Sequence, residues 1–244
     1  MPRDKWKNNI SFILIDTAEA GNIGASARAL KNCGFSKLEL VRPEKFPSNE
    51  SGWFAHGAED ILSRVKVHPD LSSALKDKAL IIGSSRRSGK KRGHTYAARD
   101  AGERIREFAE NNSVAVLFGR EDRGLTNEQT AECSFLVRIP SSDEQASLNL
   151  AQAVLIIAYE ISGASYGVAP PPSSISNVEL AELFERFRKV MKTAGYAPKG
   201  IRDEENAIMA DLRRLFARAN ITGREARMLH GVISQIETGL KKGD

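Results

Sequence analysis

Short aliphatic runs alternate with helix-like segments from the N-terminus to about residue 160. The runs are aliphatic in character and do not follow a regular alternation with polar residues, which suits parallel strands covered on both faces. Helical periodicity between them predicts helices at Ile23–Cys33, Arg99–Glu110 and Ser147–Ile161. Strands are predicted at Ile10–Ile15, Leu38–Val41, Val65–Val67, Ala79–Gly83, Val114–Phe118 and Phe135–Ile139. This alternation indicates an α/β fold with a parallel sheet.

The pattern becomes purely helical after a stretch that is rich in glycine, serine and proline. Such a composition predicts a linker, so we divide the chain into an α/β domain at 1–162, a linker at 163–175 and a helical extension at 176–244. Ser176 and Glu179 have the spacing of a capping box at the start of the extension. Three helices make a thin core alone, so we expect the extension to pack on the first domain or on a second subunit.

Composition narrows the classes of partner. The 244 residues carry a net charge of +5, which favours anionic partners, although a solvated surface explains this total equally well. Cys33 and Cys133 lie far apart and no Cys/His motif is present, so no metal site is predicted. The chain has no signal-peptide core and no apolar run approaching a membrane span of about 20 residues. We therefore expect a cytoplasmic protein that does not enter membranes.

Three polar segments follow predicted strands or precede helices, at the sheet edge where open α/β folds bind ligands. Gly21–Arg28 places two glycines and an arginine at the start of a helix. Gly119–Leu125 packs four charged residues between two glycines, and Ala146–Leu150 brings a hydroxyl and an amide. Taken singly, each segment has an ordinary explanation: a surface arginine, charges paired in solvent, or a helix N-cap.

Taken together, the segments resemble the three signature motifs of the SpoU/TrmH-type RNA 2′-O-ribose methyltransferases of the SPOUT superfamily. The matching patterns are N-x-G-x-x-x-R at Asn22–Arg28, F-G-x-E-x-x-G-L at Phe118–Leu125, and I-P followed by S-x-N at Ile139–Asn149. The resemblance extends over nearly the whole chain to the TrmJ branch, whose C-terminal signature is similar to Leu212–Arg218.

This resemblance implies a SPOUT-type parallel sheet with helices on both faces and a C-terminal trefoil knot, plus a small all-α extension. It also implies S-adenosylmethionine as cofactor, a homodimer whose active site is completed across the interface, and 2′-O-methylation of tRNA at nucleotide 32. Ribosomal RNA is an alternative substrate because the core motifs are shared, and a catalytically silent RNA-binding member is a further alternative. A dinucleotide-binding dehydrogenase lacks support because the GxGxxG pattern is missing.

The resemblance assigns roles to individual positions. The expected catalytic residues are Arg28, Asn22, Glu121, Ser147 and Asn149. The expected cofactor contacts are Ser84, Ser85, Arg86, Leu117, Gly119, Gly124, Ile139, Ala146, Ser147 and Leu148. A guanidinium stays protonated, so we expect Arg28 to grip a phosphate and stabilise an oxyanion, with the other catalytic residues orienting it and the ribose.

A basic run contributes the expected RNA contacts. The stretch from Arg86 to Arg92 holds five basic residues and no acid. Such a loop either grips phosphates without reading sequence or is simply solvated. His94 and Tyr96 adjoin it and are candidates for stacking on an unpaired base. The expected RNA-binding residues are Arg28, Arg86, Arg87, Lys90, Lys91 and Arg92.

Overall fold

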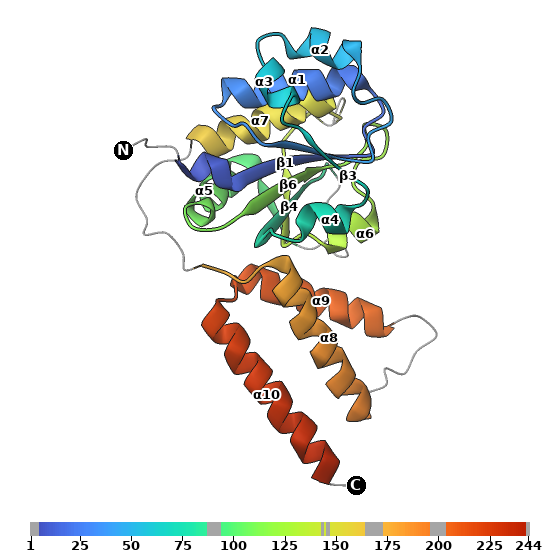
Figure 1. Cartoon of the computed structure of the whole chain (residues 1–244), viewed down its shortest axis with the longest axis vertical. Helices are drawn as coiled ribbons and strands as arrows, with labels where there is room; N and C mark the ends of the chain where they lie inside the picture. Colours follow the sequence, from blue (N-terminus) through green and yellow to red (C-terminus); the bar gives the residue numbers. More distant parts are fainter. Residues whose placement is uncertain are drawn as a thin grey trace.

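A parallel sheet of seven strands forms the centre of the first domain (Figure 1). The computed structural model describes residues 5–86, 94–142, 144, 147–163, 173–195 and 204–242. The strand order is β3-β2-β1-β6-β4-β7-β5 and every neighbouring pair is parallel. The strands are β1 Ile10–Ile15, β2 Leu38–Val41, β3 Lys66–His68, β4 Leu80–Ser84, β5 Thr95–Ala97, β6 Val114–Phe118 and β7 Phe135–Arg138.

The prediction of a parallel α/β sheet is confirmed, and the structure adds one strand to it. β5 has three residues, all half-buried, and it pairs only with β7 at the sheet edge. So short an edge strand leaves no apolar run for a sequence pattern to detect. β1 is buried along its whole length between β2 and β6, which explains why five of its six residues are apolar. The sixth, Ser11, accepts a hydrogen bond from the Nζ of Lys78 at 3.1 Å.

Helices cover both faces of the sheet. One face is covered by α1 Ala20–Asn32, α5 Ala98–Ala109 and α7 Leu150–Gly163, while the short helices α4 Leu71–Leu75 and α6 Asn127–Ala131 lie on the other (Figure 1). Two more short helices, α2 Asn49–Ala55 and α3 Glu59–Leu62, pack on α1, and a 3-10 turn at Lys5–Asn9 precedes β1. Helices of four to seven residues give too little periodicity to predict, so α2, α3, α4 and α6 were not expected.

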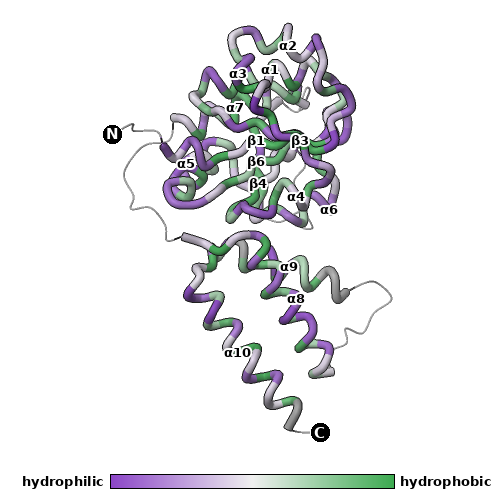
Figure 2. Tube along the Cα trace, in the orientation of Figure 1, coloured by the Kyte–Doolittle hydropathy of each residue, from purple (hydrophilic) through white to green (hydrophobic). Residues whose placement is uncertain are grey.

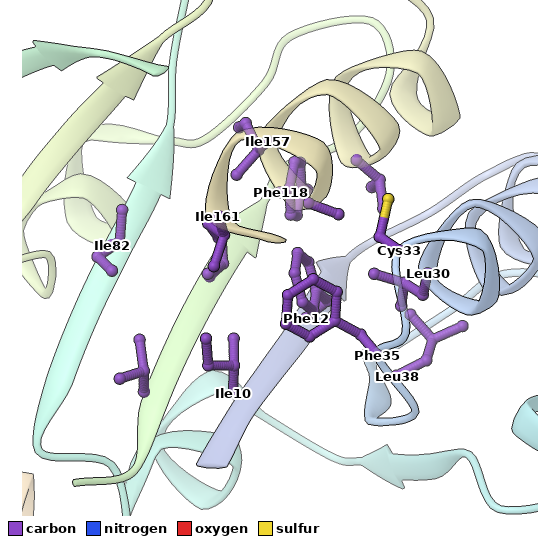
Figure 3. Packing of buried hydrophobic residues seen from close by; sticks show 14 of the residues in the cluster. Ile10, Phe12, Leu30, Cys33, Phe35, Leu38, Ile82, Phe118, Ile157 and Ile161 are labelled. Carbon is purple, nitrogen blue, oxygen red and sulfur yellow. The ribbon is translucent and has the colours of Figure 1, made fainter. Parts of the chain in front are cut away.

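The larger hydrophobic core lies between the sheet and the first group of helices. Figure 3 shows Phe12 and Phe118 of the central strands facing Ile157 and Ile161 of α7. A second core cluster, which includes Ile13 and Leu117, fills the opposite face. Full burial of such side chains contributes roughly 1.5–3 kcal/mol each. Figure 2 shows the resulting segregation of hydrophobic strands from more polar outer segments.

The helix that follows the third polar segment begins later than the periodicity predicts. α7 begins at Leu150, not at Ser147. The side-chain Oδ1 of Asn149 accepts hydrogen bonds from the backbone N–H groups of Ala151 and Gln152, at 2.9 and 3.4 Å. Asn149 thus caps the helix, and Ser147 and Leu148 remain in the preceding loop, where their side chains can face a ligand.

Three helices form the C-terminal extension, α8 Asn177–Thr193, α9 Glu204–Ala219 and α10 Gly223–Lys242. Ser176 and Glu179 form the predicted capping box at the start of α8. The extension contacts the first domain: the N–H of Asn177 donates to the carbonyl of Lys78 at 2.8 Å, and Arg213 pairs with Glu132 at 3.1 Å. Within the described parts of the chain, no helix is long and apolar enough to cross a membrane.

Two expectations about the chain's organisation stay predictions. Most of the linker placed at 163–175 lies outside the described residues. The trefoil knot that the resemblance implies also remains a prediction; what the structure supplies is the parallel order of the strands around β6, β4 and β7.

Candidate active site

A cavity opens at the carboxyl ends of β4, β6 and β7. It is lined by Ser84, Ser85, Arg86, Phe118, Gly119, Arg120, Glu121, Asp122, Arg123, Gly124, Leu125, Ile139, Ser147, Leu148, Leu150 and Ala153. Eight of the ten expected cofactor contacts belong to this set. Leu117 does not, because it is fully buried in the hydrophobic cluster beneath the cavity, and Ala146 lies outside the described residues. The structure therefore gathers residues from three separate loops around one space.

The enclosed space is small. The described residues surround about 140 Å³, whereas pockets that bury a drug-sized ligand typically have roughly 300–1,000 Å³. A ligand of nucleoside size would therefore extend beyond the space that these residues enclose. The lining mixes apolar side chains such as Ile139 and Leu148 with the hydroxyls of Ser84 and Ser147, which suits a ligand with one flat apolar part and several polar groups.

Two glycines shape the loop that follows β6. The backbone N–H of Gly124 donates to the carbonyl of Arg120 at 2.7 Å, and Gly124 has a positive φ of 70°. A Cβ atom at Gly119 would lie 2.2 Å from the carbonyl carbon of Gly124. Because that neighbour is backbone, it cannot move aside as a flexible side chain could. The loop therefore folds back on itself only with glycine at 119, and prefers glycine at 124.

Glu121 organises the region between this loop and the start of α1. Its Oε1 accepts from the Nδ2 of Asn22 at 2.9 Å and from the N–H of Glu19 at 3.3 Å, and its Oε2 accepts from the N–H of Ala18 at 3.1 Å. Burial alone would raise the pKa of Glu121, but these hydrogen bonds outweigh it and hold the pKa below its usual value. Glu121 is consequently an ionised acceptor at neutral pH, and it fixes the orientation of the Asn22 amide.

Asn22 is in turn hydrogen-bonded to Asn149, in the third polar segment. Its Oδ1 accepts a hydrogen bond from the Nδ2 of Asn149 at 2.8 Å, while the Oδ1 of Asn149 caps α7. Three residues that lie up to 127 positions apart in the chain thus form one chain of hydrogen bonds from Glu121 through Asn22 to Asn149. Ser147 is exposed and lines the cavity beside them. Four of the five expected catalytic residues are brought together in this way.

Arg28 is the exception. Its side chain is exposed and makes no hydrogen bond or ion pair within the part of the chain that the structure describes. It lies six residues after Asn22 on α1, which places it about 9 Å further along the helix axis and on a different side of the helix. Within this chain Glu121 and Asn22 bond to each other and to Asn149, so the expectation that they orient Arg28 stays a prediction.

One of the remaining charges of the second segment, Arg120, also has a partner that the sequence did not reveal. Arg120 pairs with Glu44, which follows β2, and with Asp122 in its own turn at 3.4 Å. Arg123 lines the cavity and is exposed. Only the fold brings Glu44 to this edge, because 76 residues separate it from Arg120.

The expected RNA contacts are placed only in part. Arg86 is exposed at the edge of the cavity, whereas Arg87, Lys90, Lys91 and Arg92 lie outside the described residues. The ring of Tyr96 packs edge-on against Phe135 at 5.1 Å between centroids and lies under the Arg104 guanidinium at 4.7 Å. Tyr96 is thus occupied by the fold and is a poor candidate for base stacking. Among the described residues, no group of three or more His, Cys, Asp or Glu could hold a metal ion.

Comparison with known proteins agrees with this geometry. The SpoU rRNA Methylase family model matches residues 9–159, and the model of the C-terminal domain of tRNA methyltransferase TrmJ matches 178–244. A tRNA (cytidine/uridine-2′-O-)-methyltransferase TrmJ of Photorhabdus laumondii is 37% identical over 241 residues, covering 96% of this chain and 99% of the relative. The corresponding protein of Pectobacterium atrosepticum is 36% identical over 234 residues, covering 94% and 97%.

Solved structures agree as well. The crystal structure of TrmJ from Z. mobilis ZM4 superposes with a TM-score of 0.78 at 30% identity, covering 93% of this chain and 98% of that one. A probable methylase family protein from Haemophilus influenzae superposes at 0.62 with 29% identity, covering 98% of this chain and 100% of that one. These matches span both domains, and the chain therefore belongs to the SpoU rRNA methylase family, with a C-terminal domain of the TrmJ type.

Proposed function

We propose that this protein transfers the methyl group of S-adenosylmethionine to a ribose 2′-hydroxyl of tRNA, at nucleotide 32 of the anticodon loop. The observation that carries the proposal is the hydrogen-bonded chain from Glu121 through Asn22 to Asn149 beside the cavity. The TrmJ relatives, which are named for tRNA cytidine/uridine 2′-O-methylation and match almost the whole chain, support tRNA as the substrate. A tRNA substrate also implies a cytoplasmic location.

The residues of the cavity fit S-adenosylmethionine. The missing side chain at Gly119 lets the turn fold back on itself, and the open space at the Cβ position of Gly124 lets a ligand approach the backbone of the turn. Ile139 and Leu148 offer apolar surface to a purine, and the hydroxyls of Ser84 and Ser85 offer hydrogen bonds to a ribose. When bound, the cofactor supplies an electrophilic methyl group to the hydroxyl.

The protein's own residues would position the accepting ribose. A 2′-hydroxyl is a weak nucleophile at neutral pH, so the site must align it and assist the loss of its proton. Ser147 is exposed in the loop before α7, where its hydroxyl is available to a ribose, while Asn149 is held in place by Asn22 and by the first turn of α7. The negative charge of Glu121 is directed at Asn22 and the backbone, so we assign Glu121 to holding the site's shape and not to proton removal.

We assign Arg28 a role in the active site of a second subunit. Its position on α1 leaves it outside the hydrogen-bonded cluster of its own chain, and its guanidinium is exposed. We propose a homodimer in which Arg28 of one chain reaches the active site of the other, grips a phosphate of the tRNA and stabilises the developing oxyanion. Arginine is suited to this role because its charge is permanent and its geometry matches phosphate.

The central experiment measures methyl transfer to defined RNA. Purified protein is incubated with S-adenosylmethionine carrying a labelled methyl group and an unmodified tRNA transcript. A matched transcript differs only by a 2′-deoxyribose at nucleotide 32, and an rRNA fragment serves as a further control. We expect label in the first transcript alone. Label in rRNA alone, or in no RNA, would overturn the proposed function, and equal label in the deoxy transcript would overturn the position.

Subunit complementation tests the role of Arg28. We expect Arg28→Ala and Asn149→Ala each to abolish transfer when assayed alone. Mixed dimers of the two variants contain one intact site only if Arg28 acts across the interface, so mixing should restore part of the activity. If the mixture stays inactive while size measurements show that subunits exchange, Arg28 acts within its own chain or not at all.

A further inference from the structure

Two adjacent aromatic side chains on α2 project from the surface. Trp53 is 76% exposed and Phe54 is 53% exposed, which is unusual for the two most hydrophobic aromatic types. Their neighbours are small or polar: Gly52 has no atom within 4 Å of a Cβ position, and His56 is exposed. Trp53 and Phe54 therefore form a narrow aromatic edge in solvent and not the centre of a broad apolar patch.

This aromatic edge is held firmly against the first turn of α1. A Cβ atom at Gly21 would lie 3.1 Å from Cδ2 of Phe54, so the Phe54 ring rests on the residue next to Asn22. Further along, a Cβ at Gly24 would lie 2.1 Å from the carbonyl oxygen of Ser51, which means that the backbones of the two helices touch. Because Asn22 belongs to the cluster with Glu121 and Asn149, the aromatic edge has a fixed position relative to the candidate active site.

One exposed cation, Arg28, lies on the same side of α1 as the aromatic edge, and one carboxylate, Glu50, lies beside Phe54. Arg28 follows Gly24 by four residues and Gly21 by seven, so it lies on the face of α1 that α2 covers, one turn beyond the crossing. The pair of helices thus presents two exposed rings and an exposed guanidinium. Surfaces that bind single-stranded nucleic acid combine such elements, with aromatic rings stacking on bases and cations contacting the backbone phosphates.

Trp53 and Phe54 do not form the centre of an interface between two copies of the chain. Stable protein interfaces bury about 800 Å² on each partner around an apolar centre. Two side chains flanked by Glu50, Gly52 and His56 do not provide such a centre. Base stacking, in contrast, needs no more than one or two exposed rings per nucleotide.

We propose that Trp53 and Phe54 stack on unpaired bases next to the nucleotide that is methylated, so that the aromatic edge selects a single-stranded loop. This proposal rests on the proposed function, because it takes RNA as the ligand. Replacing one ring should raise the KM for tRNA by roughly 5- to 150-fold per base, which corresponds to a stacking contribution of about 1–3 kcal/mol. Affinity for S-adenosylmethionine alone should not change.

Steady-state kinetics provides the first test. Trp53→Ala and Phe54→Leu are compared with Val67→Ala, which removes apolar surface from an exposed side chain on β3, away from α2. Phe54→Leu keeps an apolar contact with Gly21 while removing the ring, which limits damage to folding. We expect a raised KM for tRNA in the first two variants and wild-type values in the third. Unchanged KM in both ring variants would overturn the proposal.

Fluorescence provides a readout that does not depend on turnover. The chain has two tryptophans, and Trp6 is only 2% exposed, so quenching by an added RNA reports on Trp53. A single-stranded anticodon-loop oligonucleotide should quench the wild type and not Trp53→Phe, and a duplex of the same sequence should quench neither. If Trp53→Ala instead weakens self-association in sedimentation, with no quenching by RNA, the aromatic edge is an interface between copies and the proposal is wrong.

The two proposals fail in different ways. Absence of methyl transfer by the wild type to every RNA would refute the proposed function, whatever the variants at Trp53 and Phe54 do. Normal transfer by the wild type, with no change in KM and no quenching, would refute only the stacking role of α2.

Discussion

Replacing Glu121 by glutamine changes the charge of the site while leaving its size almost unchanged. The wild-type carboxylate accepts hydrogen bonds from Asn22, Ala18 and Glu19 through its two oxygens. The glutamine amide keeps one oxygen but presents an NH₂ group to at least one N–H donor. One bond is therefore lost, and the remaining ones lose the strength that a charged acceptor gives them.

The expected magnitude follows from those bonds. Hydrogen bonds to charged groups contribute about 1.5–3 kcal/mol when buried, and the region around Glu19 is exposed, so we expect Glu121→Gln to cost about 1–2 kcal/mol of unfolding free energy. For a chain of this length, such a loss lowers the melting temperature by roughly 2–8 °C. The rate of methyl transfer should also fall at temperatures where the variant is still fully folded, because Asn22 no longer has a fixed orientation toward Asn149.

The effect should depend on pH in a definite direction. The pKa of Glu121 is held below its unfolded value of about 4.3, so its ionised form stabilises the folded state at any pH above that value. This contribution is lost as the pH falls through the lower folded-state pKa. The difference in melting temperature between wild type and Glu121→Gln should therefore be full at pH 7 and shrink as the pH approaches and passes below 4.

Thermal melts between pH 3 and 8 measure this difference, with Asp122→Asn as the matched control. Asp122 lies in the same turn, is exposed and pairs only with Arg120 among the described residues, so its replacement should cost between about 0 and 1 kcal/mol. If Glu121→Gln melts like the wild type at pH 7, or if its deficit persists unchanged at pH 3, the assigned hydrogen-bond network is not what stabilises the site.

Three further outcomes are expected. Gly119→Ala should abolish S-adenosylmethionine binding in calorimetry because the new Cβ meets backbone, whereas Gly124→Ala should cost only the roughly 1–2 kcal/mol of a left-handed residue and retain binding; equal binding by both variants would contradict this. Lys78→Met should lose up to about 3–5 kcal/mol in urea denaturation, because buried Glu39 loses Lys78 and keeps His68 at 2.7 Å. Adding Glu39→Gln should recover much of that loss; an unchanged unfolding free energy in Lys78→Met would contradict this. Cys133 is buried and its thiol pKa is raised by burial, so it should resist iodoacetamide at pH 8 in the folded protein and react after denaturation; rapid labelling of the native protein would disprove its burial.

Strands that are buried on both faces were predictable from their composition alone. β1 and β6 appear with the residues that the apolar runs indicated, because a strand covered on both faces is made mostly of apolar residues. β5 and α2 were not predictable, since a short edge strand and a seven-residue helix carry almost no periodic signal. Because α2 bears the aromatic edge, the surface that we propose to bind RNA bases could not be predicted from the sequence.

The candidate site was likewise predictable from the sequence only in part. The residue types in Asn22–Arg28, Phe118–Leu125 and Ile139–Asn149 are enough to place a ligand site at one sheet edge, because they follow strands and carry glycines and polar groups. The hydrogen-bond partners of these residues could not be predicted from the sequence. Glu121 bonds to Asn22 across 99 positions, and Asn22 bonds to Asn149 across 127.

The local sequence pattern therefore predicts the class of fold and the sheet edge at which a ligand binds. Only the tertiary structure shows that Glu121 holds Asn22 and that Arg28 lies outside this hydrogen-bonded cluster. The physical reason is the range of the interactions. Hydrophobic residues recur every two to four positions in a strand or a helix, so this pattern can be recognised within a short window of the sequence. A hydrogen bond requires its two atoms within about 3 Å, and residues that are distant in the chain reach that separation only when the whole sheet has assembled around them.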